Sequence, residues 1–149
     1  MSDLDTPAVR RLPVVLFVCT ANSARSIMAE AILRHHAGDR FEAHSCGMAP
    51  AGINPLSIEV LQERGIDTAG LRSKSTDDYL GKVPVRDAII LCDKAQLECP
   101  RLYPFAHRVF FWPFEDPAVA PPALRLQKFR AVRDAIEAQV LAWAKGAAA

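Results

Sequence analysis

The chain has 149 residues, of which 50% are hydrophobic and 23% charged, the balance of a folded globular protein. This length suits a single domain with a sizeable core. The formal net charge is +1, which gives no bias toward nucleic acid or a membrane surface as a partner. No apolar run in the sequence reaches membrane-spanning length, so no membrane-spanning helix is expected.

The N-terminal segment, residues 1–12, is polar and lacks the apolar region of a secretory signal. We therefore expect a flexible leader over 1–12, one domain over 13–145, and a cytoplasmic location. In that reducing compartment, cysteines are more typical of catalytic, redox or metal-binding roles than of structural disulfides. The chain has four, Cys19, Cys46, Cys92 and Cys99.

Short apolar runs alternate along the chain with stretches that repeat apolar residues at helical spacing. Strands are expected at residues 13–19, 41–47, 87–92 and 107–112. Helices are expected at 26–38, at 54–65 with Asn54 as cap, at 77–80 with Ser75 or Thr76 as cap, and at 120–146. This alternation predicts an α/β fold, a four-stranded parallel sheet flanked by helices on both faces. Ligands of such sheets bind at the carboxyl ends of the strands, where Cys19, Cys92 and Trp112 stand.

The segment of residues 19–25, CTANSAR, joins the first predicted strand to the first predicted helix. Free N–H groups and the helix dipole at such a turn favour an oxyanion, and the same positive potential favours a thiolate. Cys19 is the candidate nucleophile, and the planar fork of Arg25 can bind two oxygens of a tetrahedral anion. The alternative is a buried, inert cysteine beside a surface arginine. The predicted substrate-binding residues are Thr20, Ala21, Asn22, Ser23, Ala24 and Arg25, of which Asn22 tolerates a left-handed backbone, and Ser26 adds a hydroxyl.

Cys92 and Cys99 form a C-x6-C pair, which is not the spacing of a zinc site. They are either two ordinary packed cysteines or a dithiol that oxidises during turnover. In a single helix their Cα atoms would lie about 10.5 Å apart along the axis. A disulfide requires less than about 7 Å. The segment is therefore looped, or it unwinds when the bond forms.

Asp116 precedes Pro117, a pairing that favours a projecting turn. A carboxyl group there can protonate a leaving oxygen, although a surface Asp-Pro turn is also common. The other polar residues are weaker candidates for a functional site. The four histidines show no metal-ligand spacing and are interpreted as surface or supporting residues, Cys46 as a packed small residue, and Lys74 as a solvated one.

Four segments, in order, resemble the thioredoxin-coupled arsenate reductases, which share the fold of the low-molecular-weight protein tyrosine phosphatases. The segments are FVCTANSARSIMAEAIL, the stretch SCGMAP to INPLSIEVLQERGID to RSKS, LCDKAQLECP and WPFEDPA, and the resemblance covers residues 13–143. The Cys-x5-Arg-Ser loop and the Asp-Pro pair are common to both groups. The C-x6-C pair marks the reductases, and the ending Asp-Pro-Ala lacks the tyrosines that often follow in the phosphatases.

The resemblance implies that Cys19 attacks arsenate held by the loop amides and Arg25. Ser26 would help to keep Cys19 as thiolate, and Asp116 would help the leaving oxygen depart.

It further implies that Cys92 attacks the Cys19–arsenic adduct, releasing arsenite and leaving a Cys19–Cys92 disulfide. Cys99 would then attack Cys92, and the new 92–99 disulfide would pass to a thioredoxin-like reductant or a similar external thiol. No bound cofactor is implied. A monomer without a nucleic-acid or membrane partner is expected.

Some members of that family bind a monovalent cation near the loop. Asn22, Glu30 and Ser45 match three of its ligands, while the fourth, an aspartate, is not clearly matched near residues 76–78. No other metal is expected.

Three functions stay open on the sequence. Arsenate reduction requires the C-x6-C pair, whereas a low-molecular-weight protein tyrosine phosphatase requires only Cys19, Arg25 and Asp116. A non-catalytic oxyanion-binding domain requires the loop but not its thiol. A phosphatase also needs aromatic walls beside the loop, for which the chain offers Trp112, Phe114 and Tyr79.

Overall fold

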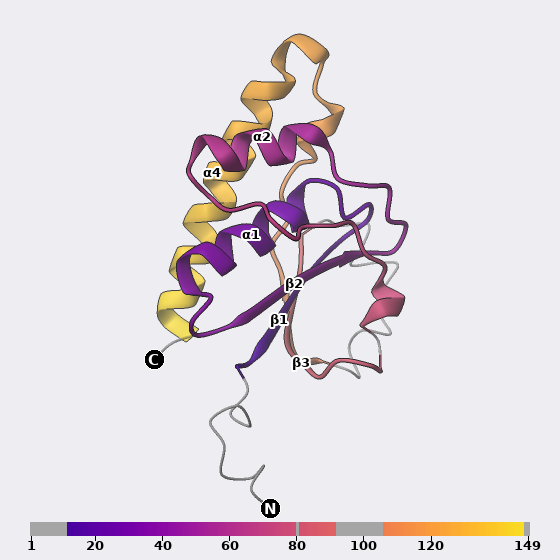
Figure 1. Cartoon of the computed structure of the whole chain (residues 1–149), viewed down its shortest axis with the longest axis vertical. Coiled ribbons are helices and arrows are strands. Elements are labelled where there is room, and N and C mark those ends of the chain that lie inside the picture. Colours follow the sequence, from indigo (N-terminus) through magenta and orange to yellow (C-terminus); the bar gives the residue numbers. More distant parts are fainter. Residues whose placement is uncertain (1–11, 80, 92–105, 148–149) are drawn as a thin grey trace, which may run out of the picture.

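The computed structural model describes residues 12–79, 81–91 and 106–147. Strands and helices alternate through these ranges (Figure 1). The strands are β1 (Val14–Cys19), β2 (Glu42–Gly47), β3 (Val85–Ile90) and β4 (Ala106–Phe111). The α-helices are α1 (Arg25–Ala37), α2 (Pro55–Glu63) and α4 (Pro122–Ala147), and two 3-10 helices are η3 (Thr76–Asp78) and η5 (Pro117–Val119).

The four strands form one parallel sheet, as the alternation of elements predicts. The structure sets their order as β2-β1-β3-β4. Strand β1 lies between two neighbours and is buried along its whole length. Its register sets Val18 beside both Cys46 of β2 and Ile90 of β3. A strand covered on both faces needs no polar side, which explains the unbroken run VVLFVC in the sequence.

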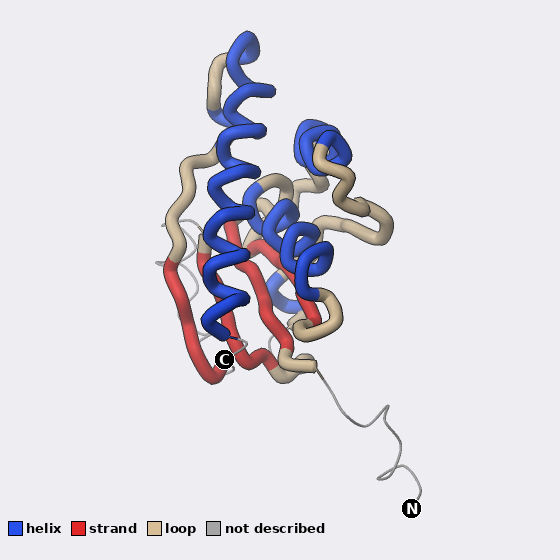
Figure 2. Tube along the Cα trace, turned by 90° about the vertical axis from the view of Figure 1, so that its left-hand side faces the viewer, coloured by secondary structure: helices blue, strands red, loops and turns tan. Residues whose placement is uncertain are grey.

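The three α-helices share one hydrophobic core with one face of the sheet. Alternate residues of β1, Val15 and Phe17, enter this core together with the apolar stripe of α4. The stripe consists of Phe129, Val132, Ile136 and Val140, with Leu126 and Trp143 at its margins. Figures 1 and 2 show α4 as a long rod that runs beside α1 and α2.

The opposite face of the sheet carries a second, smaller core. Val14, Leu16 and Val18 of β1 point into it, together with Cys46 of β2. Among the described residues, this face is covered by Tyr79, which directly follows the 3-10 helix η3, and by partly buried side chains of neighbouring loops. Cys46 is fully buried, as its interpretation as a packed small residue requires.

Helix boundaries follow the predicted signals closely. The Asn54 side chain accepts a hydrogen bond from Leu56 N and so caps α2, with Pro55 as its first residue. Ser75, one of the two predicted caps, caps η3. Strand β3 begins two residues earlier than predicted, since Val85 already pairs with β4.

Residues 1–11 of the predicted leader and both cysteines of the C-x6-C pair lie outside the described residues. The division into a leader over 1–12 and a domain over 13–145 therefore stays a prediction. Within the described part of the chain, no helix combines the length and the apolar character needed to cross a membrane.

Candidate active site

The loop between β1 and α1 begins at Cys19, the last residue of β1, and ends at Arg25, the first residue of α1. It lies at the carboxyl edge of the sheet, where parallel α/β folds place their ligands. The Cys19 side chain is 2% exposed, and its Sγ lies 2.8 Å from Ser26 Oγ. The predicted nucleophile and hydroxyl are therefore in direct contact at the start of a helix.

Asn22 holds the middle of the loop in shape. Its backbone φ of 47° lies in the left-handed region, as predicted, and its side chain is fully buried. The amide nitrogen donates to Ser26 Oγ at 2.8 Å and to Ser45 Oγ at 3.0 Å. The amide oxygen accepts from the backbone N–H of Lys74 at 2.6 Å. Asn22 thus ties the loop to α1, to β2 and to the segment before η3.

The carbonyl groups of the loop point outward, into the surrounding scaffold. Thr20 O accepts from Ala49 N at 2.9 Å, and Ala21 O accepts from Ala51 N at 3.0 Å. Ser23 O accepts from Asn54 N at 3.0 Å, and further bonds reach these carbonyls from the hydroxyls of Ser57 and Ser73.

In a trans peptide the C=O of one residue and the N–H of the next point in opposite directions, and the described residues contain no cis peptide. Outward carbonyls at positions 20, 21 and 23 therefore turn the N–H groups of Ala21, Asn22 and Ala24 inward. Inward-facing amides of this kind are the donors that an oxyanion site requires.

Gly47 allows this loop to lie against the end of β2. A Cβ at this position would lie 2.6 Å from the Thr20 carbonyl oxygen and 2.8 Å from the Asn22 backbone nitrogen. Both are backbone atoms that cannot yield, so any larger residue would displace the loop. The sequence analysis did not identify this requirement, because it arises only from the pairing of Cys19 with Gly47.

Arg25 and Asp116 meet beside the loop although 91 positions separate them in the chain. The Arg25 guanidinium donates to the carbonyl of Phe114 at 3.1 Å and lies 3.7 Å from Asp116 Oδ2. The other oxygen, Oδ1, caps η5 by accepting from Ala118 N at 3.0 Å. The Arg25 side chain is 12% exposed and that of Asp116 is 38% exposed. The predicted Asp-Pro turn therefore projects its carboxylate toward the predicted anion-binding arginine.

A buried ion pair lies behind the loop, and the interpretation of Lys74 as a solvated residue is wrong. Lys74 is 6% exposed, and its Nζ lies 3.3 Å from Glu30 Oε1. Ser45 also donates a short hydrogen bond to Glu30 Oε1. The stretch RSKS gives no local sign of burial. The tertiary signal is the parallel bridge of Gly47 with Ser75, which lays this stretch against β2.

The aromatic residues considered as walls of a phosphatase site are engaged in packing. The Trp112 ring centroid lies 6.3 Å from that of Phe17 and 6.2 Å from that of Trp143. The Tyr79 hydroxyl contacts His44 Nδ1 at 3.2 Å, and burial, followed by the negative charge of Glu30, raises the pKa of Tyr79 above its usual value. Phe114 packs against the main core and contributes its carbonyl to the site.

Two of the histidines form ion pairs or hydrogen bonds with carboxylates. His36 contacts Glu137 at 2.7 Å, and His44 contacts Glu42 at 2.6 Å, so both serve as partners of carboxylates. Nowhere in residues 12–79, 81–91 and 106–147 do three histidine, cysteine or carboxylate side chains gather as a metal site. The predicted roles of Cys92 and Cys99 fall outside these ranges and stay predictions.

Comparison with known proteins finds one matching family model and several similar proteins that cover most of the chain. The sequence model described as low molecular weight phosphotyrosine protein phosphatase matches residues 14–148. An arsenate reductase of Shouchella clausii (strain KSM-K16) is 35% identical over 137 residues, which cover 89% of this chain and 95% of that protein. Two solved structures are each 28% identical to the chain. An arsenate reductase in the phosphate-binding state has a TM-score of 0.75 and covers 89% of this chain and 96% of its own. A thioredoxin-dependent arsenate reductase of Corynebacterium glutamicum has a TM-score of 0.71 and covers 97% of this chain and 65% of its own.

The family match extends from the first residue of β1 to the end of α4, and so includes every element that builds the site. The relatives also share the fold over most of their own length. The chain therefore belongs to the low molecular weight phosphotyrosine protein phosphatase family.

Proposed function

We propose that the protein is an arsenate reductase in which Cys19 is the nucleophile. The observation that carries this proposal is one strand-to-helix loop that holds the Cys19 thiol against the Ser26 hydroxyl, ends at Arg25 and turns its carbonyls outward. That arrangement suits attack on a tetrahedral oxyanion. Similarity to arsenate reductases at 35% identity supports arsenate as the anion and reduction as the outcome.

In the first step the Cys19 thiolate attacks arsenic(V). A sulfur–arsenic bond forms, one arsenic–oxygen bond breaks, and the leaving oxygen departs as water after receiving a proton. We assign this proton transfer to Asp116, which is supported by the 3.7 Å distance from its Oδ2 to the guanidinium that would bind the anion. Arg25 has five N–H donors, so its bond to Phe114 O leaves others for the substrate.

The second step reduces arsenic, and its residues are proposed from the resemblance. Cys92 attacks the sulfur of Cys19, the sulfur–sulfur bond forms, and the electron pair of the broken sulfur–arsenic bond stays on arsenic. Arsenite, arsenic(III), leaves. Cys99 then attacks Cys92 and releases Cys19 as thiolate, so that two thiols have supplied two electrons and a 92–99 disulfide remains.

A thioredoxin-type dithiol is the proposed external reductant, because one structural relative is described as thioredoxin-dependent. Thiol relays of this kind operate where a thioredoxin system keeps cysteines reduced, which favours the cytoplasm as the place of action. We further propose that the enzyme works as a monomer. Size-exclusion chromatography with light scattering tests that point, and a mass near twice 16.3 kDa would contradict it.

The test is multiple-turnover arsenite formation with arsenate, thioredoxin, thioredoxin reductase and NADPH. Cys19→Ser is expected to abolish arsenite formation, and Cys92→Ser and Cys99→Ser to stop it after at most one turnover. Cys46→Ala provides a control, since this thiol lies outside the loop, and should turn over repeatedly. Sustained turnover by the Cys92 and Cys99 variants would overturn the relay.

Hydrolysis of a phosphate monoester tests the second candidate function in the same preparations. A phosphatase would need Cys19, Arg25 and Asp116 but neither Cys92 nor Cys99. Efficient p-nitrophenyl phosphate hydrolysis without arsenite formation in the wild-type protein would favour the phosphatase. Peptide mapping of a 92–99 disulfide after arsenate turnover would favour the reductase.

A further inference from the structure

Two backbone hydrogen bonds, one from its N–H and one to its C=O, hold Lys74 in place. Its N–H donates to the Asn22 side chain at 2.6 Å, and its C=O accepts from Gly47 N at 2.8 Å. One bond reaches the loop and the other reaches the end of β2. The position of the side chain therefore depends on the same contacts that shape the loop.

The ammonium group of Lys74 has three oxygen partners inside the protein. Its Nζ lies 2.9 Å from Arg72 O, 3.3 Å from Glu30 Oε1 and 3.5 Å from Ser45 Oγ. An ammonium has three protons and no acceptor, so this set satisfies it. The Lys74 and Glu30 side chains are only 5% and 7% exposed, and such a buried pair is tolerable only when each charge has its counterpart. The other oxygen of Glu30 lies 3.9 Å from the guanidinium of Arg34, which is 38% exposed, so Lys74 is the nearer and the buried one of its two cationic partners.

A continuous chain of hydrogen bonds joins this pair to the thiol, and its direction follows from the groups available. Ser45 gives its single proton to Glu30, so its oxygen is an acceptor for Asn22. The two protons of the Asn22 amide nitrogen go to Ser45 and Ser26. Ser26 therefore accepts from Asn22 and has its own proton left for Cys19 Sγ, 2.8 Å away. The chain directs a hydroxyl proton at the sulfur, which stabilises the thiolate form.

This arrangement does not fit the monovalent cation that the resemblance raised for Asn22, Glu30 and Ser45. The Lys74 ammonium lies within hydrogen-bonding distance of both Glu30 and Ser45, and the Asn22 oxygen accepts a backbone N–H instead. A second positive charge beside the ammonium would be repelled.

We propose that Lys74 is a positioning residue that supplies from within the chain the positive charge behind the loop. It keeps Glu30 as the acceptor at the far end of the chain, and thereby keeps Ser26 as the donor to Cys19. The loop consequently needs no added monovalent cation for its reactivity. The inference rests on the proposed function only in treating Cys19 as the reactive thiol.

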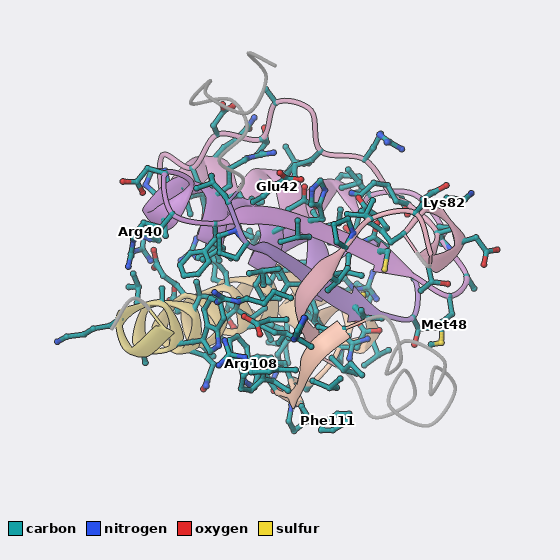
Figure 3. The ribbon with its side chains drawn as sticks, turned by 90° about the horizontal axis from the view of Figure 1, so that it is seen from below. Arg40, Glu42, Met48, Lys82, Arg108 and Phe111 are labelled. Carbon is teal, nitrogen blue, oxygen red and sulfur yellow. The ribbon has the colours of Figure 1, made fainter. Side chains whose placement is uncertain are left out.

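The test reads the Cys19 thiol directly, by its rate of alkylation with iodoacetamide between pH 5 and 9, followed by mass spectrometry of the Cys19 peptide. Lys74→Met should slow alkylation at pH 6 about tenfold and move the midpoint of the profile upward, the size expected for one charge-assisted hydrogen bond. Lys82→Met is the matched control, an exposed lysine on the surface (Figure 3), and should reproduce the wild-type profile. A folded Lys74→Met protein with the wild-type profile would overturn the proposal.

Exchange of the buffer cation provides a test that needs no variant. Wild-type alkylation and thermal stability should be the same in potassium, sodium and tetramethylammonium chloride at equal ionic strength. A saturable acceleration by potassium alone would reveal a cation site that Lys74 does not fill, and would overturn the proposal. In Lys74→Ala, methylammonium should restore part of the lost rate, whereas tetramethylammonium should not. Because alkylation requires neither arsenate nor the other thiols, these results stand apart from any failure of reductase activity.

Discussion

Two buried carboxylates, Glu30 and Asp87, are neutralised in different ways. Asp87, in the first half of β3, is fully buried and bound by the guanidinium groups of Arg86 and Arg108, whose side chains are 34% and 53% exposed. Figure 3 shows Arg108 on the side of the molecule viewed from below. Glu30, behind the loop that follows β1, lies 3.3 Å from Lys74, which is itself buried, and 3.9 Å from Arg34, which is 38% exposed.

A buried polar group costs stability when its partner is buried too. An exposed guanidinium returns to water when its carboxylate is removed, so the Asp87 cluster resembles an ordinary surface arrangement with one buried member. The buried Lys74 ammonium, by contrast, cannot return to water and depends on Glu30. The second arrangement occurs where the hydrogen bonds continue to Cys19. Four substitutions test this contrast.

Glu30→Ala is expected to have the largest effect on stability. It leaves the Lys74 ammonium buried without its carboxylate, and loss of one member of such a pair costs about 3–5 kcal/mol. Urea unfolding measures the free energy of unfolding, with Glu59→Ala, an exposed glutamate of α2, as the control. A loss below about 1 kcal/mol would mean that the pair is hydrated, and the contrast with Asp87 would disappear.

Asp116→Asn is expected to slow the reaction while leaving the free energy of unfolding almost unchanged. Its carboxylate is 38% exposed, and the asparagine oxygen can still cap η5, so unfolding should change by less than about 0.5 kcal/mol. Single-turnover loss of arsenate should slow about a hundredfold, equal to about 2.7 kcal/mol of activation free energy, if the carboxyl assists the leaving oxygen. Unchanged kinetics would remove Asp116 from the proposed mechanism.

Asp87→Asn should lower stability without altering the site. The amide keeps the shape of the side chain but loses the charge-assisted bonds to two arginines, which costs about 1–2 kcal/mol. Cys19 alkylation and arsenite formation should stay at wild-type rates. If either rate falls along with stability, the two carboxylates do not belong to separate regions.

Tyr79→Phe tests the smallest effect, a dependence of stability on alkaline pH. Burial, and then the charge of Glu30, raise the pKa of Tyr79 above its value of about 10 in the unfolded chain. The contribution is therefore full below pH 10 and is lost as pH rises toward the folded value, since only the unfolded chain then releases the proton. Urea unfolding at pH 9, 10 and 11 should show a shallower decline for Tyr79→Phe. Identical declines would mean that Tyr79 ionises freely in the folded protein.

Features that depend on neighbours in sequence were predicted correctly. The strand ending at Cys19, the helix starting beside it, the left-handed Asn22 and the Asn54 cap all follow from residues within a few positions of each other. Such features follow from local backbone preferences and hydrogen bonds, which the sequence displays directly. The burial of β1 also followed, because an unbroken apolar run has no side to turn toward water.

The burial of Lys74 could not be predicted from its neighbours in the sequence. A lysine between two serines has every local sign of a solvated residue, and nothing within the stretch RSKS indicates Glu30. Its burial arises because the segment pairs with the end of β2, which brings a carboxylate 44 positions away within 3.3 Å. The glycine requirement at position 47 has the same origin, in a contact between two strand ends.

The sequence alone was enough to predict the local frame of the candidate site: a cysteine at a strand end, an arginine six residues later, and a strand-to-helix loop between them. It did so because short-range geometry places these residues around one small volume. Only the tertiary structure decided that Asp116 and the carbonyl of Phe114 face Arg25, and that a buried lysine stands behind the loop. Those positions depend on the order of strands in the sheet and on chain segments that meet across it, which no local pattern encodes.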